Sequence, residues 1–167
     1  KYPHDSAGSI MTIEFVSLPE NITVADAFDR IRKTGVDKET IYTMYVTDEK
    51  KKLLGIVSAK DLLLASPSAK IGDIMEDNPI YVETSTDKEE VSRMIAKYGF
   101  LAMPVVDAEQ RIVGIVTVDD AMQVLQEENT EDIAKMNAIT PSDKPYLKTS
   151  VWRIWLNRIP WLLILMV

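Results

Sequence analysis

An internal repeat is the feature that most restricts how this chain can fold. Leu53–Asp61 (LLGIVSAKD) returns as Ile112–Asp120 (IVGIVTVDD), at an offset of 59 residues. Upstream, Ile10-Met11 returns as Ile74-Met75 at an offset of 64, so the first copy has five more residues than the second. We place these extra residues within Thr34–Thr40, where glycine and charged residues interrupt the pattern. The repeat predicts two similar halves.

Each copy predicts the order strand, helix, strand, strand, helix. Apolar residues at helical spacing run through Val24–Ile31 and Val91–Ile95, and the N-caps are Thr23 and either Thr86 or Asp87. Four further apolar runs have the length of strands: Thr43–Thr47, Leu53–Val57, Leu101–Val106 and Ile112–Val116. We therefore predict an α/β (α+β) fold, in which each repeat is a small sheet with helices and two packed copies form the smallest stable unit.

Composition restricts the chemistry that the chain can perform. Its 167 residues are 46% hydrophobic, which suffices for one well-packed domain or for two halves sharing a core. With no cysteine and only His4 as an imidazole, a bound metal must be held by oxygen ligands, which favour Mg²⁺, Ca²⁺ or Mn²⁺. The sequence has no Ser–His–Asp set, Walker loop or dinucleotide-binding turn, so we do not expect an enzyme.

Charge is unevenly distributed along the chain. The formal net charge is −7, but the residues from Ile133 onward carry +4 and the preceding residues −11. An acidic body argues against nucleic acid as a partner, because phosphate binding needs clustered Lys and Arg on the body.

One acidic helix is the candidate metal sensor. Ala121–Ala138 has helical apolar spacing and no Gly or Pro, and it places Glu128, Glu131 and Asp132 on one side. Like charges at this spacing repel, and a hydrated Mg²⁺ would remove the repulsion. The alternative is that Glu127–Asp132 is a solvated helix face.

The motif Gly-Ile-Val-[Ser/Thr]-x-x-Asp, once per repeat, together with Met75–Pro79, resembles the CBS module over Ser9–Gln126. CBS pairs serve channels, transporters, kinases and metabolic enzymes, so the module alone leaves the function open. The flanks are more specific. Three parts of the chain, in the same order, resemble MgtE-type magnesium transporters: Tyr2–Met11, then Thr117–Asp120 followed by Glu128–Ile133, and Arg158–Leu165.

This resemblance implies a homodimeric Mg²⁺ transporter or channel of the cell membrane, whose cytosolic domains bind Mg²⁺ and close the pore. This segment would lie on the cytoplasmic face, and its partners would be the N-domain and the transmembrane pore domain of the same protein. The predicted organisation is the end of an N-domain linker (1–8), two CBS repeats (9–70 and 71–123), a connecting plug helix (124–138), a linker (139–150) and the start of a first transmembrane helix (151–167).

By the same resemblance, the regulatory carboxylates that would bind Mg²⁺ are Glu89, Asp120, Glu128, Glu131 and Asp132. Asp120 is expected to face the N-domain, and the others to lie nearer the plug and the dimer interface. Acids are expected in the family at the positions of Gly99 and Gln123, so sites using those positions are expected to be lost, weakened or rebuilt with water. No ligand set forms an EF-hand loop, which predicts low affinity.

CBS pairs also bind adenine nucleotides such as ATP, and the matching residues here are Ser58, Lys60, Asp61, Ile80 and Phe100. A carboxylate can accept both ribose hydroxyls, a lysine can meet phosphate, and an aromatic face can stack on adenine. In the second repeat the acidic Asp119 beside Asp120 would repel phosphate, so we expect at most one nucleotide site per chain. The alternative is that Asp61 caps the short helix Ala59–Ala65 and Phe100 is core.

The C-terminal residues resemble the cytosolic end of a transmembrane helix. All three tryptophans lie among them, and basic residues precede the apolar run Ile159–Val167, which is too short to span a bilayer. An amphipathic surface helix is the alternative. The chain begins without Met and ends inside this run, so we expect a segment of a longer protein. The competing overall hypothesis is a nucleotide-sensing CBS module that regulates another membrane or metabolic protein.

Overall fold

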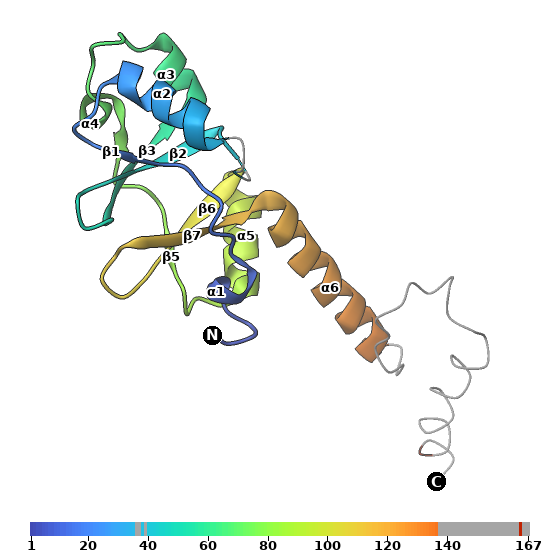
Figure 1. Ribbon diagram of the computed structural model, residues 1–167. Helices are drawn as coiled ribbons and strands as arrows, with labels where there is room; N and C mark the ends of the chain where they lie inside the picture. The colour runs from blue at the N-terminus through green and yellow to red at the C-terminus, as the bar shows by residue number, and fades with distance from the viewer. Residues whose placement is uncertain (36–37, 39, 137–163, 165–167) are drawn as a thin grey trace. The chain divides into compact units, whose positions relative to one another are not determined.

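A computed structural model describes residues 1–35, 38, 40–136 and 164. Residues 1–122 form one compact unit, and residues 123–167 belong to a second. The described helices and strands (Figure 1) are, in chain order, α1 (Ala7–Ile10), β1 (Ser17–Pro19), α2 (Val24–Thr34), β2 (Thr43–Thr47), β3 (Leu53–Ser58), α3 (Ala59–Leu64), α4 (Ile71–Ile74), β4 (Glu76–Asp77), β5 (Val82–Glu83), α5 (Lys88–Tyr98), β6 (Ala102–Val106), β7 (Ile112–Thr117) and α6 (Val118–Met136).

Two small mixed sheets are built on one plan. The first has the order β1-β2-β3-β4 and the second β5-β6-β7; in each, a parallel pair precedes an antiparallel hairpin. Leu18 lies opposite Val46 in the first sheet, as Val82 lies opposite Val105 in the second. These pairs preserve both offsets of the sequence repeat, so the predicted α/β architecture of two similar halves is confirmed.

The repeats exchange their opening segments. β4, from the start of the second repeat, pairs with β3 of the first, while Thr12, from the start of the first, bridges Ile115 in β7. Glycine permits both approaches. A Cβ on Gly55 would lie 2.7 Å from the Glu76 carbonyl oxygen, and a Cβ on Gly114 would lie 2.9 Å from that of Thr12. Each repeat therefore completes the sheet of the other.

Three apolar clusters form the core of residues 1–122, and they follow the exchange. The first centres on Leu18, Val46 and Leu62 but includes Ile71 of α4, and the second includes Ala7 of α1. A third cluster joins the two sheets and contains Tyr45, Ala102, Ile112 and Ile115, with Phe15, Leu53 and Ile56 packed against it.

The helix ends explain where the repeats differ in length. α2 and α5 are related by 64 residues, but β2 and β6 by 59, so the five extra residues of the first repeat fall between Thr34 and Thr43. In the second repeat, Gly99 ends α5 in the left-handed region (φ 67°). Its equivalent, Gly35, has φ −77°. The chain thus turns back at once after α5, where the first repeat uses a longer connection.

Thr23 and Asp87 are the N-caps of α2 and α5. The Thr23 hydroxyl accepts a hydrogen bond from the Asp26 N–H, and Asp26 accepts one back from the Thr23 N–H, which forms a capping box. The Asp87 carboxylate accepts from the Glu89 and Glu90 N–H groups. Thr86, the other candidate, instead accepts from the Glu83 N–H.

The long helix predicted from Ala121 is present as α6, which begins at Val118 and is described to Met136. Residues 137 and 138, the predicted linker (139–150) and the predicted start of a transmembrane helix (151–167, apart from Ile164) lie outside the described residues. Within the described part of the chain, no helix is both long enough and apolar enough to cross a membrane.

Candidate metal and nucleotide sites

Ser58 and Asp61 form a reciprocal cap at the start of α3. The Ser58 hydroxyl donates to Asp61 Oδ2 at 2.6 Å and accepts from the Asp61 N–H at 3.1 Å. The Ser58 N–H also donates to the same carboxylate oxygen at 3.1 Å. A capping box of this kind stabilises the helix and fixes the carboxylate in one orientation at the surface. Ser58 is the N-cap, and Asp61 completes the box from the first turn.

The second repeat builds the same cap at the start of α6. The Thr117 hydroxyl donates to Asp120 Oδ2 at 2.9 Å and receives the Asp120 N–H at 3.4 Å. The residue just before the capping acid differs in charge between the repeats. It is the exposed Lys60 in the first repeat and the exposed Asp119 in the second. The charge difference from which we expect at most one nucleotide site is therefore between two equivalent positions, Lys60 and Asp119.

Phe100 is half-buried and packs against the second core cluster. Its ring stacks on that of Tyr98, with centroids 5.4 Å apart and an interplanar angle of 21°. Ile80 lies exposed just before β5. In the described part of the chain, no hydrogen bond or ion pair joins Phe100 or Ile80 to the Ser58–Asp61 cap.

Of the carboxylates proposed for metal in the first unit, Glu89 and Asp120 have separate partners. Glu89 lies in the first turn of α5 and pairs with Arg93 one turn later, at 3.3 Å. Asp120 is half-buried and bonded within its cap.

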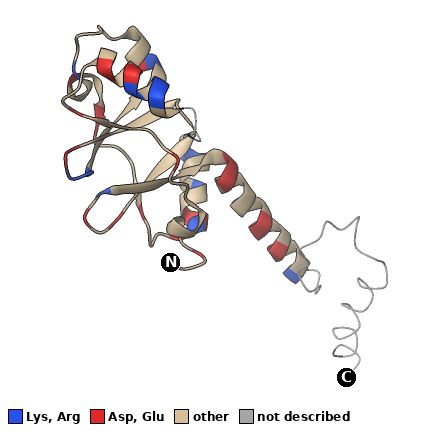
Figure 2. Cartoon of the chain, in the orientation of Figure 1, with Lys and Arg blue, Asp and Glu red and all other residues tan. Residues whose placement is uncertain are grey.

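The acidic positions of α6 follow one another along the helix, as Figure 2 shows. Glu131 and Asp132 share a single cation, since Lys135 Nζ lies 3.7 Å from Glu131 Oε2 and 4.0 Å from Asp132 Oδ1. Both carboxylates are exposed, and Glu128, on the same helix, is half-buried. Surface pairs of this kind contribute little stability, so Lys135 is a weak competitor for a divalent ion.

The two expected acids that this chain lacks have local structural roles. Gly99 caps α5 in a backbone conformation that L-residues rarely adopt, so an acid there would be strained. Gln123 donates from Nε2 to Glu127 Oε1 at 3.1 Å and so holds one carboxylate of α6. Across the residues whose positions are described, no three acidic or histidine side chains gather closely enough to hold a metal ion.

The resolved pKa shifts lie away from these proposed sites. Hydrogen bonds from His4 and then Lys88 hold the pKa of Asp5 below its ordinary value. Burial acts to raise the pKa of Asp107, but hydrogen bonds from the backbone N–H and guanidinium of Arg111 outweigh it and leave that pKa lowered. The side chain of His4 itself is almost fully exposed.

Sequence reasoning missed a set of exposed apolar side chains at equivalent positions of the two repeats. Tyr42 is 67% exposed and its equivalent Leu101 is 55% exposed; Leu63 is 73% exposed and its equivalent Met122 is 54% exposed. The backbone carbonyls of Tyr42 and Leu101 accept hydrogen bonds from the first N–H groups of α3 and α6, respectively. The 59-residue offset relates Tyr42 to Leu101 and Leu63 to Met122, but it does not indicate that these side chains are exposed. We call these four residues the apolar pairs.

Comparison with known proteins supplies the remaining information. The sequence profile of the CBS domain matches residues 7–68 and 71–127. The chain is 46% identical over 165 residues to the magnesium transporter MgtE of Thermus thermophilus, a match that covers 99% of this chain and 37% of that protein. It is 40% identical to MgtE of Bacillus subtilis, over 99% of this chain and 36% of that protein. The chain thus spans little more than a third of these relatives.

Two solved structures are similar in fold. A crystal structure of the cytosolic domain of the Mg²⁺ channel MgtE in complex with ATP has a TM-score of 0.72 and 47% identity, covering 74% of this chain and 50% of that one. The soluble part of a magnesium transporter has a TM-score of 0.74 and 40% identity, covering 76% of this chain and 50% of that one.

Proposed function

The chain belongs to the CBS-domain family, and from this premise we propose that it is the Mg²⁺-sensing regulatory domain of a magnesium transporter. The observation that carries the proposal is the 46% sequence identity to MgtE of Thermus thermophilus, which extends over 99% of this chain and so includes α6. The parent protein would lie in the cell membrane, with this segment on its cytoplasmic face. Its partners would be its own N-domain and pore domain.

Sensing would depend on the carboxylates of α6. Glu131 and Asp132 lie exposed beside one lysine, and like charges this close are tolerated better when a hard cation sits among them. The remaining ligands of the ion would be acids of a second protomer, such as Glu89 of α5 or Asp120 in the first turn of α6. Binding would then favour one arrangement of the protomers over another and close the pore.

The apolar pairs support a homodimer. Tyr42 and Leu101 lie beside the N-terminal ends of α3 and α6, and Leu63 and Met122 lie on those helices. All four expose apolar side chains of the kind that a homodimer would bury. We expect Leu63→Glu and Met122→Glu to convert a dimer to a monomer in sedimentation velocity, while Lys60→Glu, an exposed neighbour of Leu63, leaves the dimer intact. A dimer that survives both apolar substitutions would place the interface elsewhere.

A Mg²⁺ titration tests the sensor. Small-angle X-ray scattering of the dimer should show compaction as Mg²⁺ rises, and the triple variant Glu128→Ala, Glu131→Ala, Asp132→Ala should raise the midpoint by about tenfold or more. The matched control Glu14→Ala, Glu20→Ala, Glu49→Ala removes the same charge from exposed positions of the first unit and should keep the wild-type midpoint. Equal behaviour of the two triple variants would remove α6 from the mechanism.

A second proposed function is binding of an adenine nucleotide at the Ser58–Asp61 cap, because a similar domain was crystallised with ATP. Asp61 uses Oδ2 within its cap and is exposed, so Oδ1 is the oxygen left for ribose hydroxyls. Lys60 would meet phosphate, while Ile80 and Phe100 would contact the base.

Calorimetric titration with ATP should lose binding in Lys60→Asp, which imports the charge of the second repeat. Asp119→Lys, the reverse exchange, tests whether a second site appears. Asp120→Asn should leave ATP binding unchanged. Undiminished binding in Lys60→Asp would place the nucleotide elsewhere, and the Mg²⁺ proposal would be unaffected.

A further inference from the structure

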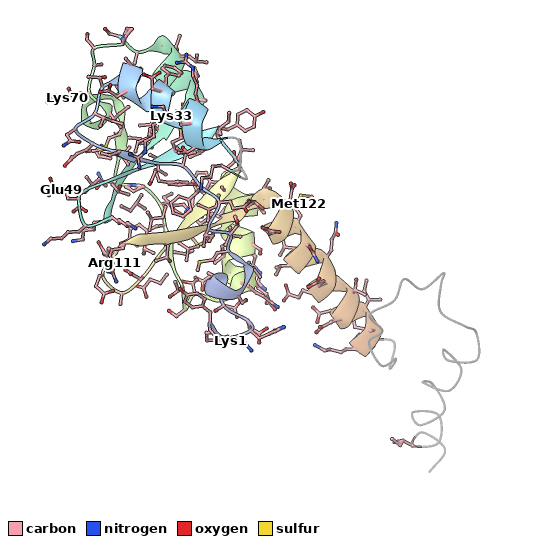
Figure 3. The ribbon with its side chains drawn as sticks, viewed as in Figure 1. Lys1, Lys33, Glu49, Lys70, Arg111 and Met122 are labelled. Carbon is pink, nitrogen blue, oxygen red and sulfur yellow. The ribbon has the colours of Figure 1, made fainter. Side chains whose placement is uncertain are left out.

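The two hairpin turns meet back to back between the sheets. The Leu53 N–H donates to the Gln110 carbonyl at 3.1 Å, and the Ile112 N–H donates to the Lys51 carbonyl at the same distance. The backbones of Lys52 and Arg111 form an isolated antiparallel β-bridge between the two turns. Every one of these positions is related to its counterpart by 59 residues, so a local two-fold axis passes through the Lys52–Arg111 bridge. Figure 3 shows the two turns, marked by Glu49 and Arg111, projecting on the same side of the molecule.

One flank of this axis is open. A cleft of about 450 Å³ lies there, with walls that include Phe15, Ser17, Thr47, Lys51 and Ile112, together with the ion-paired Asp107 and Arg111. Pockets that hold small molecules have volumes in this range and combine apolar walls with a few polar groups.

The opposite flank carries different side chains at the equivalent positions. Tyr81 occupies the position of Ser17, and Gln110 that of Lys51. The Gln110 amide donates to the Tyr81 hydroxyl at 3.1 Å, so an aromatic ring and a hydrogen bond stand where the open flank has a small hydroxyl and an ammonium group. Lys51 and Gln110 share the left-handed backbone conformation, with φ values of 64° and 62°. At Lys51 and Gln110, the two flanks therefore differ in side chain and not in backbone φ.

On the open flank, Lys51 is a lining cation that pairs with no described carboxylate. Arg111 is neutralised, because its Nε lies 2.8 Å from Asp107 and its Nη2 lies 3.2 Å from Glu109. Lys51, together with Lys50 and Lys52 in the same turn, forms no side-chain ion pair with any residue that the structure describes. The hydroxyls of Ser17 and Thr47 likewise hydrogen-bond to no other described side chain. A body that is acidic overall thus carries a local cation and spare hydrogen-bonding groups beside an apolar wall.

We propose that this cleft binds a small organic anion with a flat apolar body. Phe15 and Ile112 would contact the flat body, Lys51 would pair with the anionic group, and Ser17 or Thr47 would donate to it. The inference does not rest on the proposed Mg²⁺ or nucleotide functions, since none of the residues assigned to those functions lines the cleft.

Anilinonaphthalene sulfonate, an aromatic anion that fluoresces in apolar surroundings, is the probe. Its titration into the full 167-residue chain should show one component that Ser17→Tyr with Lys51→Gln, which copies the residues of the opposite flank, weakens by about tenfold or more. Lys51→Gln alone should weaken the same component by at most about fivefold, since its ammonium group is exposed. Lys50→Gln, next to it in the turn, should leave that component unchanged.

Two further measurements separate this site from general dye binding. Phenylnaphthylamine, which lacks the sulfonate, should respond to Ser17→Tyr but not to Lys51→Gln. Tyr81→Ser with Gln110→Lys, which copies the open flank, should add a second component for the anionic dye. Circular dichroism melting confirms that each variant is folded. If the folded Ser17→Tyr, Lys51→Gln variant binds the dye as the wild type does, the cleft is not the site and the inference is wrong.

Discussion

Ile31 in the first repeat and Ile95 in the second occupy the same position of equivalent helices, yet they are buried to different degrees. Ile95 is 1% exposed and belongs to the second core, whereas Ile31 is only partly buried at the edge of the first. The difference follows from the helix ends. Both the Gly99 and Phe100 N–H groups donate to the Ile95 carbonyl, which turns Phe100 back onto the core, while the first repeat inserts five residues at this point.

This comparison indicates that equivalent residues of the two repeats can contribute differently to stability even where the backbone is similar. The hairpins, caps and strand exchange match position by position, while burial, charge and pocket shape differ between the copies. Equivalent substitutions in the two repeats therefore measure what each copy contributes.

The largest expected difference is between Ile95→Ala and Ile31→Ala. Ile95→Ala leaves a cavity in a closed core and should lower the free energy of unfolding by about 2–5 kcal/mol. Ile31→Ala should cost less than half as much, because its surroundings are partly open to water. Urea denaturation of residues 1–167 measures both, and equal losses would show that the insertion does not loosen the first core.

The strand exchange predicts similar losses in the two repeats. Gly55→Ala and Gly114→Ala each force a methyl group toward a carbonyl oxygen of the exchanged segment and should each cost about 1–3 kcal/mol. Gly55→Ala should be the more harmful of the two, because the carbonyl it meets is nearer, at 2.7 Å. Thermal melting checks this order. Two neutral substitutions would mean that the exchanged segments yield easily.

Tyr45→Phe tests a position where the repeats differ in residue type. Tyr45 is fully buried between the sheets, its equivalent is Pro104, and its hydroxyl has no hydrogen-bond partner among the described residues. Burial raises the pKa of Tyr45 far above its ordinary value, so the group stays neutral. Removing an unpaired buried hydroxyl should leave stability unchanged or raise it by up to about 1 kcal/mol. A clear loss in urea denaturation would indicate that the hydroxyl has a partner in solution.

The smallest expected effect is the difference in stability contributed by Asp48 and Asp107, the acids of the two hairpin turns. Asp48 and Asp107 accept equivalent backbone N–H groups, but only Asp107 also pairs with an arginine. The folded-state pKa of Asp107 lies below its ordinary value of 3.8, so its contribution is present above that pH and is lost as pH falls through the folded-state pKa.

Asp107→Asn should therefore lower the melting temperature at neutral pH, and its deficit relative to wild type should shrink in acid. Asp48→Asn serves as the control and should show a smaller deficit. Melting curves at several pH values compare the two, and a deficit for Asp107→Asn that is the same at every pH would exclude the ion pair as its cause.

Much of the fold could be predicted from the sequence because its signals are local. The 59- and 64-residue offsets predicted the two halves. The polar residues before the helical patterns predicted the cap at Thr23 and restricted the cap of α5 to Thr86 or Asp87. The exchange of opening segments could not be predicted, because a two-residue strand such as β4 has no periodicity. Its sequence mark is only a glycine on the partner strand, at Gly55 or Gly114.

The candidate sites were less predictable for a different reason. Ser58 and Asp61 lie together because a capping box is a local structure. Glu89 lies on α5, Asp120 lies in the first turn of α6, and the other carboxylates lie further along α6. Spacing along a chain does not determine whether such positions converge. The cleft beside Lys51 depends on which of two equivalent positions holds a serine and which a tyrosine. That contrast carries meaning only after the two-fold relation is known.

The exchange of opening segments also limits which gene rearrangements can leave a soluble protein. If recombination removed one copy, the other would keep a sheet edge with unpaired backbone groups, and such edges promote aggregation. Gene rearrangements that preserve solubility should therefore carry both copies together, with the residues from Ser6 to Thr12 included.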